Sequence, residues 1–418
     1  MTQEIKRRIE QINCGEVPQG YKKTAVGIVP AEWQKVNLNT LLEFKNGINA
    51  EKGKFGTGIK MISVMDILEN EPIYYSTIKG SIDIDADTLE KYCVNFGDIL
   101  FQRSSETFDD AGKSNVYLDE EHTATYSGFV IRGKKISDYD PSYLNELLKT
   151  QSIRKQVIRL SAGSQHINIG QDALSEIVLN MSKIDEQHDI SEVLSKWVEA
   201  VSLQKKLIEK LELQKKALIQ KLLTPKKGWN PVSLGEILKE ASTKTEIINQ
   251  YPTISSTKKG LFLQSEYFDK DVASEDNVGY KVLKLGQIVL SPQNLWLGNI
   301  NFNNKYEFGM VSPSYKIFDI SENCNRVLIS TIMQTPRMLY QYVLSSEQGA
   351  SVVRRNLNMD LFNQIVIHLP IIDKQNCIAN QIEKFNTLFE LETQKLDKLK
   401  QQQKAMQQLL LTGIVRVS

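Results

Sequence analysis

Side chains that carry catalytic or metal chemistry are sparse in this sequence and lie far apart. None of the four histidines has a second histidine four residues further on, as a helical metal site would need. The four cysteines show no CxxC spacing, which argues against a zinc site or a disulfide framework and is typical of a reducing compartment. We therefore expect no metal and no catalytic centre in this chain.

Two segments carry fragments of cofactor-binding or methyl-transfer motifs. The pair Gly56 and Gly58 forms a lone GxG that opens no βαβ unit, and no GxxxxGK[ST] is present. The segment 139-YDPSY-143 is similar to an Asp-Pro-Pro-Tyr motif, but it lacks the second proline and a Phe-x-Gly-x-Gly partner upstream. Because it also lies at the start of a predicted helix, we interpret each segment as a turn or a helix cap.

Polar residues suited to reading nucleic-acid bases follow predicted strands or precede predicted helices. In 101-FQRSSET-107 an arginine and a glutamine follow a strand, and these side chains can bind guanine and adenine respectively. In 163-GSQHIN-168 a glycine-led loop precedes a helix whose N-terminal amides can hold a phosphate. The candidates in the first half of the chain are Gln102, Arg103, Ser104, Ser164, Gln165 and His166.

Corresponding loops occur in the second half, in 291-SPQNLWLGN-299 and 349-GASVVRRN-356. Their candidates are Gln293, Asn294, Trp296, Arg354 and Arg355. Two lysines near the start of each half are better suited to phosphates than to bases, namely Lys22 and Lys23 in the first and Lys226 and Lys227 in the second. For every loop candidate, a solvated loop or a phosphate contact without base specificity remains an open alternative.

The chain is internally duplicated. Residues 168–224 align with 356–412 at a constant offset of 188, so that Gln187 corresponds to Gln375 and Asp185 to Asp373. A second offset of 196 relates Trp33 to Trp229, which we expect to be core residues. A period this long indicates a duplicated domain rather than a solenoid repeat. Between the matching segments the two halves differ in sequence and length, which suggests that each half performs the same task on a different target.

Hydrophobic periodicity predicts the elements that position these loops. Helices are expected at 2–13, 86–92 and 142–160, the last with Ser142 as a cap, and strands at 59–67, 127–133, 96–101 and 285–290. Two longer segments, 194–222 and 382–410, carry apolar residues at steps of three and four and are expected to be long helices. The residues expected to pack along this seam are Trp197, Val201, Ile208, Leu211, Leu218, Leu222, Phe385, Phe389, Leu396, Leu399, Met406 and Leu410.

An apolar stripe this narrow cannot be buried by one helix alone. We therefore expect the two helices to pack on each other, with polar breaks at equivalent places, Gln204 with Glu392 and Lys215 with Gln403. The alternative is that each helix lies on its own domain.

Composition places few constraints on partners. With 418 residues, 41% hydrophobic, 24% charged and a net charge of +1, the chain has the profile of a soluble protein of two or three domains. Any affinity for DNA must come from local clusters of Lys and Arg. The charged N-terminus is no signal peptide, and the apolar runs are too short for a bilayer, so we expect a cytoplasmic protein without a membrane partner.

The order, duplication and spacing of these segments resemble the specificity (S) subunit of type I restriction-modification systems over nearly the whole chain. The resemblance is carried by 20-GYKKTAVGIVPAEWQKVNL-38, by 163-GSQHINIGQDALSEIVLNMSKIDEQ-187 and 356-NLNMDLFNQIVIHLPIIDKQ-375, and by the closing 411-LTGIVRV-417. The resemblance implies two target-recognition domains that each read one half of a split double-stranded DNA site. It also implies an antiparallel coiled coil that sets the spacing of the half-sites.

The same resemblance implies partners and cofactors. Two methyltransferase subunits dock on the pseudo-two-fold arrangement, and restriction (translocase) subunits join through them. S-adenosylmethionine, ATP and Mg are expected in those partner subunits and not in this chain. A different class of function, a coiled-coil scaffold that organises protein partners without reading DNA, is the alternative.

The predicted fold class is mixed α+β, with two pseudo-two-fold related globular domains built on twisted sheets and separated by two long antiparallel helices. The expected boundaries follow from the linkers and the repeat. They are an N-terminal helix and connector at 1–26, a first recognition domain at 27–184, a first spacer helix at 185–225, a second recognition domain at 226–371, and a second spacer helix with the C-terminal tail at 372–418.

Overall fold

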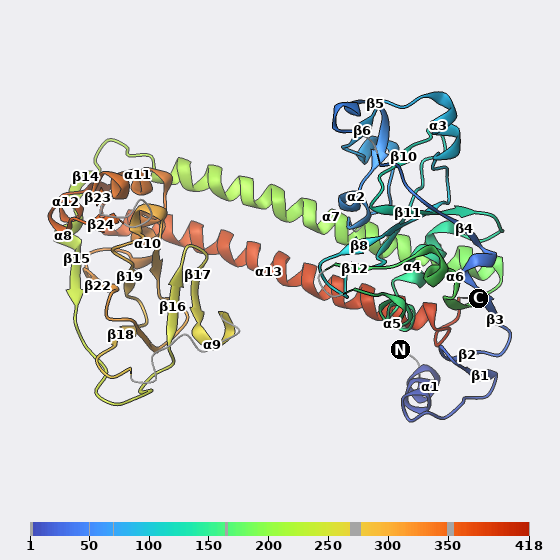
Figure 1. Ribbon diagram of the computed structural model, residues 1–418. Helices are drawn as coiled ribbons and strands as arrows, with labels where there is room; N and C mark the ends of the chain where they lie inside the picture. The colour runs from blue at the N-terminus through green and yellow to red at the C-terminus, as the bar shows by residue number, and fades with distance from the viewer. Residues whose placement is uncertain are drawn as a thin grey trace. The chain divides into compact units, whose positions relative to one another are not determined.

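The computed structural model describes residues 3–49, 51–69, 71–163, 166–267, 277–348 and 355–417. The chain divides into two compact units (Figure 1). The first unit is Met1–Lys206 together with Gln394–Ser418, and the second unit is Leu207–Thr393. Two 40-residue helices, α7 (Ile184–Leu223) and α13 (Ile372–Leu411), each contribute to both units.

The first unit mixes short helices with short strands. Its helices besides α7 and α13 are α1 (Gln3–Asn13), α2 (Val64–Ile67), α3 (Ala86–Lys91), α4 (Pro141–Leu148), α5 (Gln151–Leu160) and α6 (Gln171–Ser175). Its strands are β1 (Tyr21–Thr24), β2 (Gly27–Pro30), β3 (Gln34–Asn37), β4 (Leu42–Asn46), β5 (Phe55–Ile62), β6 (Ser81–Ile82), β7 (Ile99–Gln102), β8 (Ser104–Ser105), β9 (Ser114–Val116), β10 (Thr125–Tyr126), β11 (Val130–Lys135), β12 (Ile167–Asn168) and β13 (Val178–Met181).

The second unit has a similar set of elements. Its helices are α8 (Leu234–Ile237), α9 (Gln264–Tyr267), α10 (Arg326–Met333), α11 (Pro336–Leu344) and α12 (Met359–Asn363). Its strands are β14 (Asn230–Ser233), β15 (Leu238–Ala241), β16 (Ile254–Thr257), β17 (Gly260–Leu263), β18 (Lys281–Lys284), β19 (Ile288–Leu290), β20 (Ile300–Phe302), β21 (Phe308–Val311), β22 (Lys316–Ile320), β23 (Ser346–Gln348), β24 (Arg355–Leu357) and β25 (Val366–Leu369). The predicted mixed fold class is confirmed.

Each unit is built around the same four-stranded antiparallel sheet. The strand order is β4-β11-β7-β9 in the first unit and β15-β22-β19-β20 in the second. Ile131 pairs with Phe101 in one sheet, and Ile317 pairs with Val289 in the other. The central strand β7 is buried along its whole length, as expected for an apolar strand covered on both faces. The duplication seen in the sequence is therefore a duplication of the fold.

In each unit a two-stranded ribbon joins the segment just before the sheet region to the segment just before the long helix that follows it. Strand β3 pairs with β13, and β14 pairs with β25, both antiparallel. Val36 faces Leu179 in the first ribbon, and Val232 faces Ile367 in the second. The offset of 196 relates Val36 to Val232, and the offset of 188 relates Leu179 to Ile367. The tryptophans before the ribbons, at positions 33 and 229, are 1% and 8% exposed, as expected for core residues.

The predicted helix at 142–160 was wrong in its extent. The structure has two helices, α4 and α5, because the chain turns at Lys149 and Thr150. The cap is Asp140 rather than Ser142, since the Asp140 carboxylate accepts a hydrogen bond from the Tyr143 amide at 2.7 Å. Pro141 occupies the first helical position, where its missing N–H costs nothing.

All four strand predictions need correction at one end: β7 begins only at Ile99 and β19 only at Ile288, and turns interrupt the other two. The expected strand at 59–67 ends at Ile62, because Ser63 and Asp66 form a capping box that starts α2. The expected strand at 127–133 begins only at Val130, and the preceding residues form a tight turn closed by a bond from the Val130 amide to the Ser127 carbonyl at 2.9 Å. In both cases a local hydrogen-bonded turn interrupts an apolar run.

The long helices pack together, and their ends are part of the two cores. In the first unit, Leu194 of α7 shares a core with Leu410 and Leu411 of α13. In the second unit, Leu222 and Leu223 of α7 pack against the core that contains Ile378 and Ile382 of α13. The start of one helix therefore lies beside the end of the other, so the pairing is antiparallel.

The predicted seam residues are the inward side of this pairing. All twelve are buried or half-buried, whereas the neighbouring charged residues Lys206, Glu209, Lys210 and Glu212 are exposed. The polar break at Lys215 is half-buried, and its ammonium lies 5.6 Å from the centre of the Phe389 ring. Burial lowers the pKa of Lys215, and the aromatic face partly offsets that cost.

A buried glutamine connects each long helix to its unit. The Gln187 amide group donates to the Ser182 carbonyl at 2.8 Å, and its oxygen accepts from the backbone amide of Asp140 at 3.1 Å. The equivalent Gln375 donates to the Pro370 carbonyl at 2.9 Å and accepts from the Asn325 amide at 3.0 Å. We call each pair of bonds a glutamine clamp. Each clamp ties the first turn of a long helix to the N-cap residue of the first helix after the sheet, α4 or α10.

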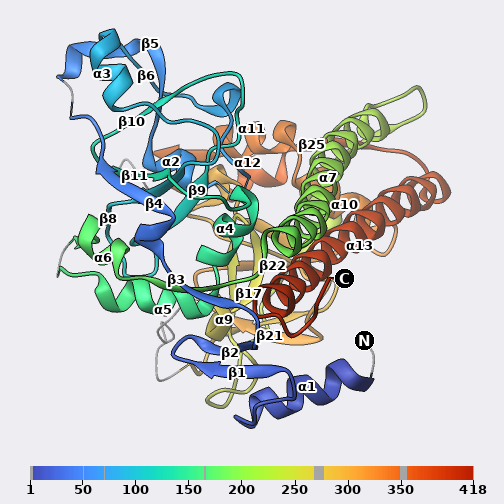
Figure 2. The same cartoon turned by 90° about the vertical axis from the view of Figure 1, so that its right-hand side faces the viewer.

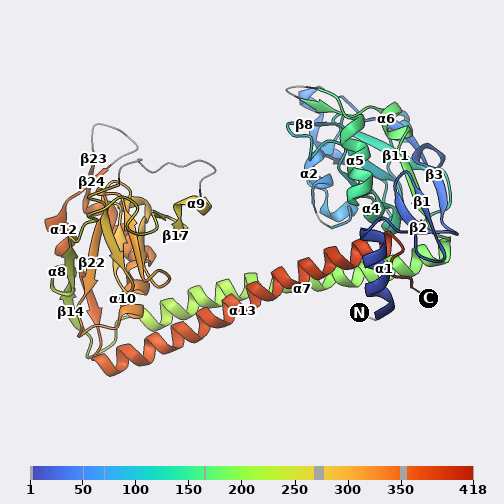
Figure 3. The ribbon, with the colours of Figure 1, turned by 90° about the horizontal axis from the view of Figure 1, so that it is seen from below.

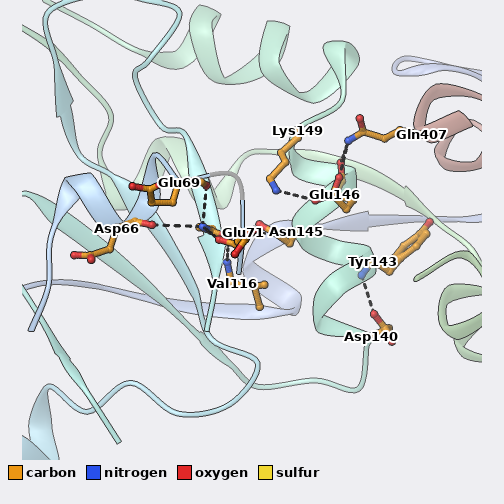
Figure 4. A network of polar contacts seen from close by, with 11 residues as sticks. Asp66, Glu69, Glu71, Val116, Asp140, Tyr143, Asn145, Glu146, Lys149 and Gln407 are labelled. Carbon is orange, nitrogen blue, oxygen red and sulfur yellow. Dashed lines mark hydrogen bonds and ion pairs between the residues drawn. The ribbon is translucent and has the colours of Figure 1, made fainter. Parts of the chain in front are cut away.

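A second polar network holds α4 in place within the first unit (Figure 4). Asn115 is completely buried and donates to the carbonyls of Glu69 at 3.2 Å and Glu71 at 2.9 Å. From α4, the Glu146 carboxylate accepts a hydrogen bond from Gln407 of α13 at 2.8 Å. These contacts connect the sheet region, α4 and the last turns of α13.

The two ends of the chain meet within the first unit, where α1, β1 and β2 lie close to the C-terminal segment (Figures 2 and 3). The Arg8 guanidinium donates to the Ile414 carbonyl at 2.7 Å. Arg416 forms ion pairs with Glu32 at 2.6 Å and with Glu186 at 2.5 Å. The N-terminal hairpin and the C-terminal segment are thus fastened to each other and to the start of α7.

We predict that the glutamine clamps stabilise their units. Gln187→Ala and Gln375→Ala each leave a buried carbonyl and a buried amide without a partner, so each should lower the free energy of unfolding by about 1–3 kcal/mol. Urea unfolding followed by circular dichroism measures the loss. Gln220→Ala, an exposed glutamine on α7, is the matched control. Clamp variants as stable as this control would contradict the prediction.

Candidate nucleic-acid interface

The structure brings together the two candidate loops of the first unit. Strand β8, from the segment at 101–107, pairs with β12, from the segment at 163–168, so that Ser104 faces Asn168. The Ser104 hydroxyl donates to the Asn168 side-chain oxygen, and the Ile169 amide donates to the Arg103 carbonyl at 3.0 Å. Loops about 60 residues apart in sequence therefore form one continuous surface segment.

Arg103 lies at the exposed end of the central sheet, directly after β7. Its side chain is half-buried, and its guanidinium donates to the Gly128 carbonyl at 3.4 Å. Arginine has five N–H donors, so this single bond leaves most of them free to bind another group. A guanidinium held on one side in this way is oriented rather than freely mobile.

Gln102 is buried rather than exposed in a loop, and its predicted role in reading a base stays a prediction. It is the last residue of β7, only 5% exposed, and its side-chain nitrogen donates to the Ser104 carbonyl at 2.9 Å. The sequence does not reveal this burial, because a polar residue at the end of a strand is usually solvated. Gln102 stabilises the turn between β7 and β8.

The remaining predicted residues of the first unit have different environments. His166 is exposed, whereas Ser164 and Gln165 lie outside the described residues. Lys23 is exposed on the β1–β2 hairpin. Lys22 is half-buried, and its ammonium donates to the Trp33 carbonyl at 2.5 Å, which gives it a structural role in the same hairpin.

In the second unit, two predicted residues from distant segments lie in contact. The Arg355 guanidinium of β24 lies 4.6 Å from the centre of the Trp296 ring. Trp296 itself is half-buried, and among the described residues its indole N–H has no hydrogen-bond partner. This cation–π pair holds a flat positive group at the protein surface.

The other candidates of the second unit flank this pair or lie at the start of the unit. Gln293 is exposed, and Asn294 is half-buried with its amide 3.4 Å from the Ser291 hydroxyl. Lys226 and Lys227 are exposed in the turn before β14. Arg354 lies outside the described residues.

The fragments of enzyme motifs have structural roles in this fold. Asp140 caps α4, and Tyr143 is buried, which raises its pKa to about 12. Gly56 and Gly58 have positive φ angles at an irregularity in the pairing of β5 with β6. Within the described ranges, no three His, Cys, Asp or Glu side chains form a group that could hold a metal ion. The same ranges contain no helix long and apolar enough to cross a membrane.

Two residues beside Arg103 were missed by sequence reasoning. Phe129 is 65% exposed at the tip of the turn before β11, and Asn49 is exposed against the same turn. The sequence pattern assigned Phe129 to a strand, and Asn49 lies in a loop without periodicity. A turn signal at Ser127 and Gly128 was the available clue.

Comparison with known proteins relates this arrangement to one family. The family model for the type I restriction modification DNA specificity domain matches residues 30–213, which include the central sheet of the first unit and the Arg103 loop. Residues 30–213 are thus similar to a type I restriction-modification DNA specificity domain. The resemblance recognised in the sequence is thereby confirmed.

One curated relative matches along nearly the whole chain, and another matches along half of it. A protein of Methanocaldococcus jannaschii, provisionally named the type I restriction enzyme MjaX specificity subunit, is 23% identical over 96% of this chain and 97% of its own length. The type I restriction enzyme MjaVIII specificity subunit of the same organism is 23% identical over 50% of this chain and 49% of its own length. These comparisons favour a specificity subunit over a scaffold protein.

Solved structures show the same fold around the specificity domain. A chain from a structure of type I restriction-modification complex assembly aligns with a TM-score of 0.57, at 12% identity, over 93% of this chain and 99% of its own. The type I S subunit from M. genitalium aligns with a TM-score of 0.50, at 14% identity, over 93% of this chain and 97% of its own. At these identities the likeness concerns the fold.

We predict that Arg355 orients Trp296. Arg355→Gln removes the cation–π contact, worth about 0.5–1 kcal/mol, and should change the environment of the indole ring. In protein labelled with 5-fluorotryptophan, the ¹⁹F resonance of Trp296, assigned with Trp296→Phe, should shift while the other tryptophan resonances stay in place. Arg326→Gln, an exposed arginine elsewhere in the same unit, should leave the resonance unchanged. An unmoved Trp296 resonance in Arg355→Gln would refute the pairing.

Proposed function

We propose that this protein is the DNA sequence-specificity subunit of a type I restriction-modification complex, and that each globular unit reads one half of a bipartite DNA site. The observation that carries the proposal is the duplicated central sheet, one copy of which lies in the matched specificity domain. Two copies of one scaffold are suited to two half-sites, because a protein with internal pseudo-symmetry offers two equivalent binding surfaces.

Different side chains at the sheet ends support different base preferences for the two units. The first unit places Arg103 after β7, and the second unit places a proline, Pro292, at the corresponding position, since the amides of Gln102 and Ser291 make equivalent bonds to the carbonyls of Lys113 and Asn299. The second unit instead has the stacked pair of Trp296 and Arg355. Arginine binds guanine through two parallel hydrogen bonds, so its presence in one unit and absence from that position in the other gives unequal half-sites.

The long helices are proposed to set the half-site spacing and to dock two methyltransferase subunits, through which restriction subunits join. The seam from Leu194 to Leu222 corresponds to roughly 42 Å of helix. Methyl transfer and cleavage would take place in those partners, which would hold S-adenosylmethionine, ATP and Mg. This chain would then be non-catalytic and act in the cytoplasm.

Salt-dependent binding separates this function from a coiled-coil scaffold. The assembled complex should bind the duplex that carries its methylated motif, and its affinity should fall steeply and linearly in a plot of log K against log salt concentration, because phosphate contacts release counterions. Methylome sequencing of cells with the complex defines the motif. A complex that binds its motif no better than a scrambled duplex would contradict DNA reading, and the scaffold function would then be favoured.

Shortening both helices tests their role as a spacer. Removing 205–211 and 393–399, two heptads at the same 188-residue offset, should shorten the helical pair by about 10 Å. The spacer of the methylated motif should then shrink by roughly three base pairs, while both half-site sequences persist. Methylome sequencing reads out the new motif. If both helices lose a heptad and the spacer of the methylated motif keeps its length, the helices do not set the half-site spacing.

A further inference from the structure

The turn before β11 presents an aromatic ring on a rigid backbone. The Ser127 amide donates to the Ile62 carbonyl at 3.0 Å, and the Gly47 amide donates to the Val130 carbonyl at 3.0 Å. The Phe129 carbonyl itself accepts from the Arg103 amide at 2.9 Å. Neighbouring strands therefore hold the turn on both sides, although the Phe129 side chain is 65% exposed.

Two polar side chains lie against the same turn. The Arg103 guanidinium donates to the Gly128 carbonyl at 3.4 Å. A Cβ atom built on Gly128 would lie 1.8 Å from the Asn49 side-chain oxygen, so Asn49 occupies the space beside the glycine. Three separate segments thus place an amide, a guanidinium and an aromatic ring at one end of the sheet. We call Asn49, Arg103 and Phe129 the tip cluster.

The second unit shows that the shared fold does not require an exposed ring at this place. The Val130 amide donates to the Ser127 carbonyl at 2.9 Å, and the Tyr315 amide donates to the Ser312 carbonyl at 3.0 Å. These equivalent turns make Ser314 the counterpart of Phe129. Ser314 is exposed, so the second unit has a small polar side chain where the first unit has an exposed aromatic ring.

We propose that the tip cluster contacts base edges in one half of the DNA site. The proposal rests on the proposed function and adds the residues that discriminate bases in the first unit. Each member has a matching partner in the major groove, because arginine binds guanine, asparagine binds adenine, and phenylalanine contacts the thymine methyl group. A protein-docking site has a contiguous apolar centre, whereas the neighbours of Phe129 are polar.

The cluster is preorganised for this contact. Its backbone is fixed by hydrogen bonds to β7 and to the segment at 47–48, so little conformational entropy is lost when a ligand binds. A larger residue at position 128 would meet the Asn49 side-chain oxygen, so Gly128 leaves room for that side chain beside the turn.

Binding of the assembled complex to substituted duplexes tests the proposal. Each base pair of both half-sites, as defined by methylome sequencing, is replaced singly, and the dissociation constants are compared between wild type and variants. Phe129→Ala should weaken binding of the intact site about tenfold and abolish discrimination at one or two adjacent base pairs of one half-site. The other half-site should be read as before. Phe129→Leu should retain part of the affinity, since it keeps an apolar contact.

Phe96→Ala is the matched control, because Phe96 is 40% exposed and precedes the opposite end of β7. It should bind every duplex as the wild type does, and thermal unfolding should show all variants folded. Three variants test the cluster, namely Phe129→Ala, Asn49→Ala and Arg103→Ala. If all three discriminate bases as the wild type does, the proposal that the tip cluster reads bases is overturned, while the proposed function stands. A wild-type complex that binds all duplexes equally would overturn the proposed function itself.

Discussion

The glutamine clamp is the interaction on which the placement of each long helix on its unit depends. A single side chain in each copy satisfies a carbonyl just before the long helix and the backbone amide of the residue that caps α4 or α10. An amide side chain is suited to this place because it donates and accepts at once. Since both glutamines are 4% exposed, water cannot replace either bond. The clamp therefore fixes where the sheet ends and the helix begins.

The surroundings of the two clamps differ, although their geometry is the same. In the first unit His188 lies 2.8 Å from the Asp140 carboxylate, whereas in the second unit Asn376 accepts a hydrogen bond from Asn325 at 2.9 Å. A histidine–carboxylate pair in one unit corresponds to a pair of amide side chains in the other, and the backbone bonds are the same. The shared framework thus tolerates chemical divergence one residue away from its central contact, which is also what the loops at the sheet ends show.

Much of this architecture could be predicted from sequence, because duplication and heptad spacing are signals carried by many residues. The 188-residue offset predicts the identical lengths of α7 and α13, from Ile184 with Ile372 to Leu223 with Leu411. The candidate loops were found because they follow strands. Individual environments were not predictable: the burial of Gln102 and the exposure of Phe129 depend on which neighbouring strand covers them. Such contacts come from segments far apart in sequence, and they leave no periodic pattern.

The fastening of the chain ends has a consequence for the order of synthesis. Leu410 and Leu411 belong to the core of the first unit, and the Tyr21 hydroxyl donates to the Gly413 carbonyl at 2.7 Å. Residues 1–206 therefore lack part of the core of their unit until residues 394–418 are made. The second unit, which is one continuous stretch, has no such dependence. A nascent chain of this protein should therefore complete the second unit before the first, because residues 394–418 are made after residues 207–393.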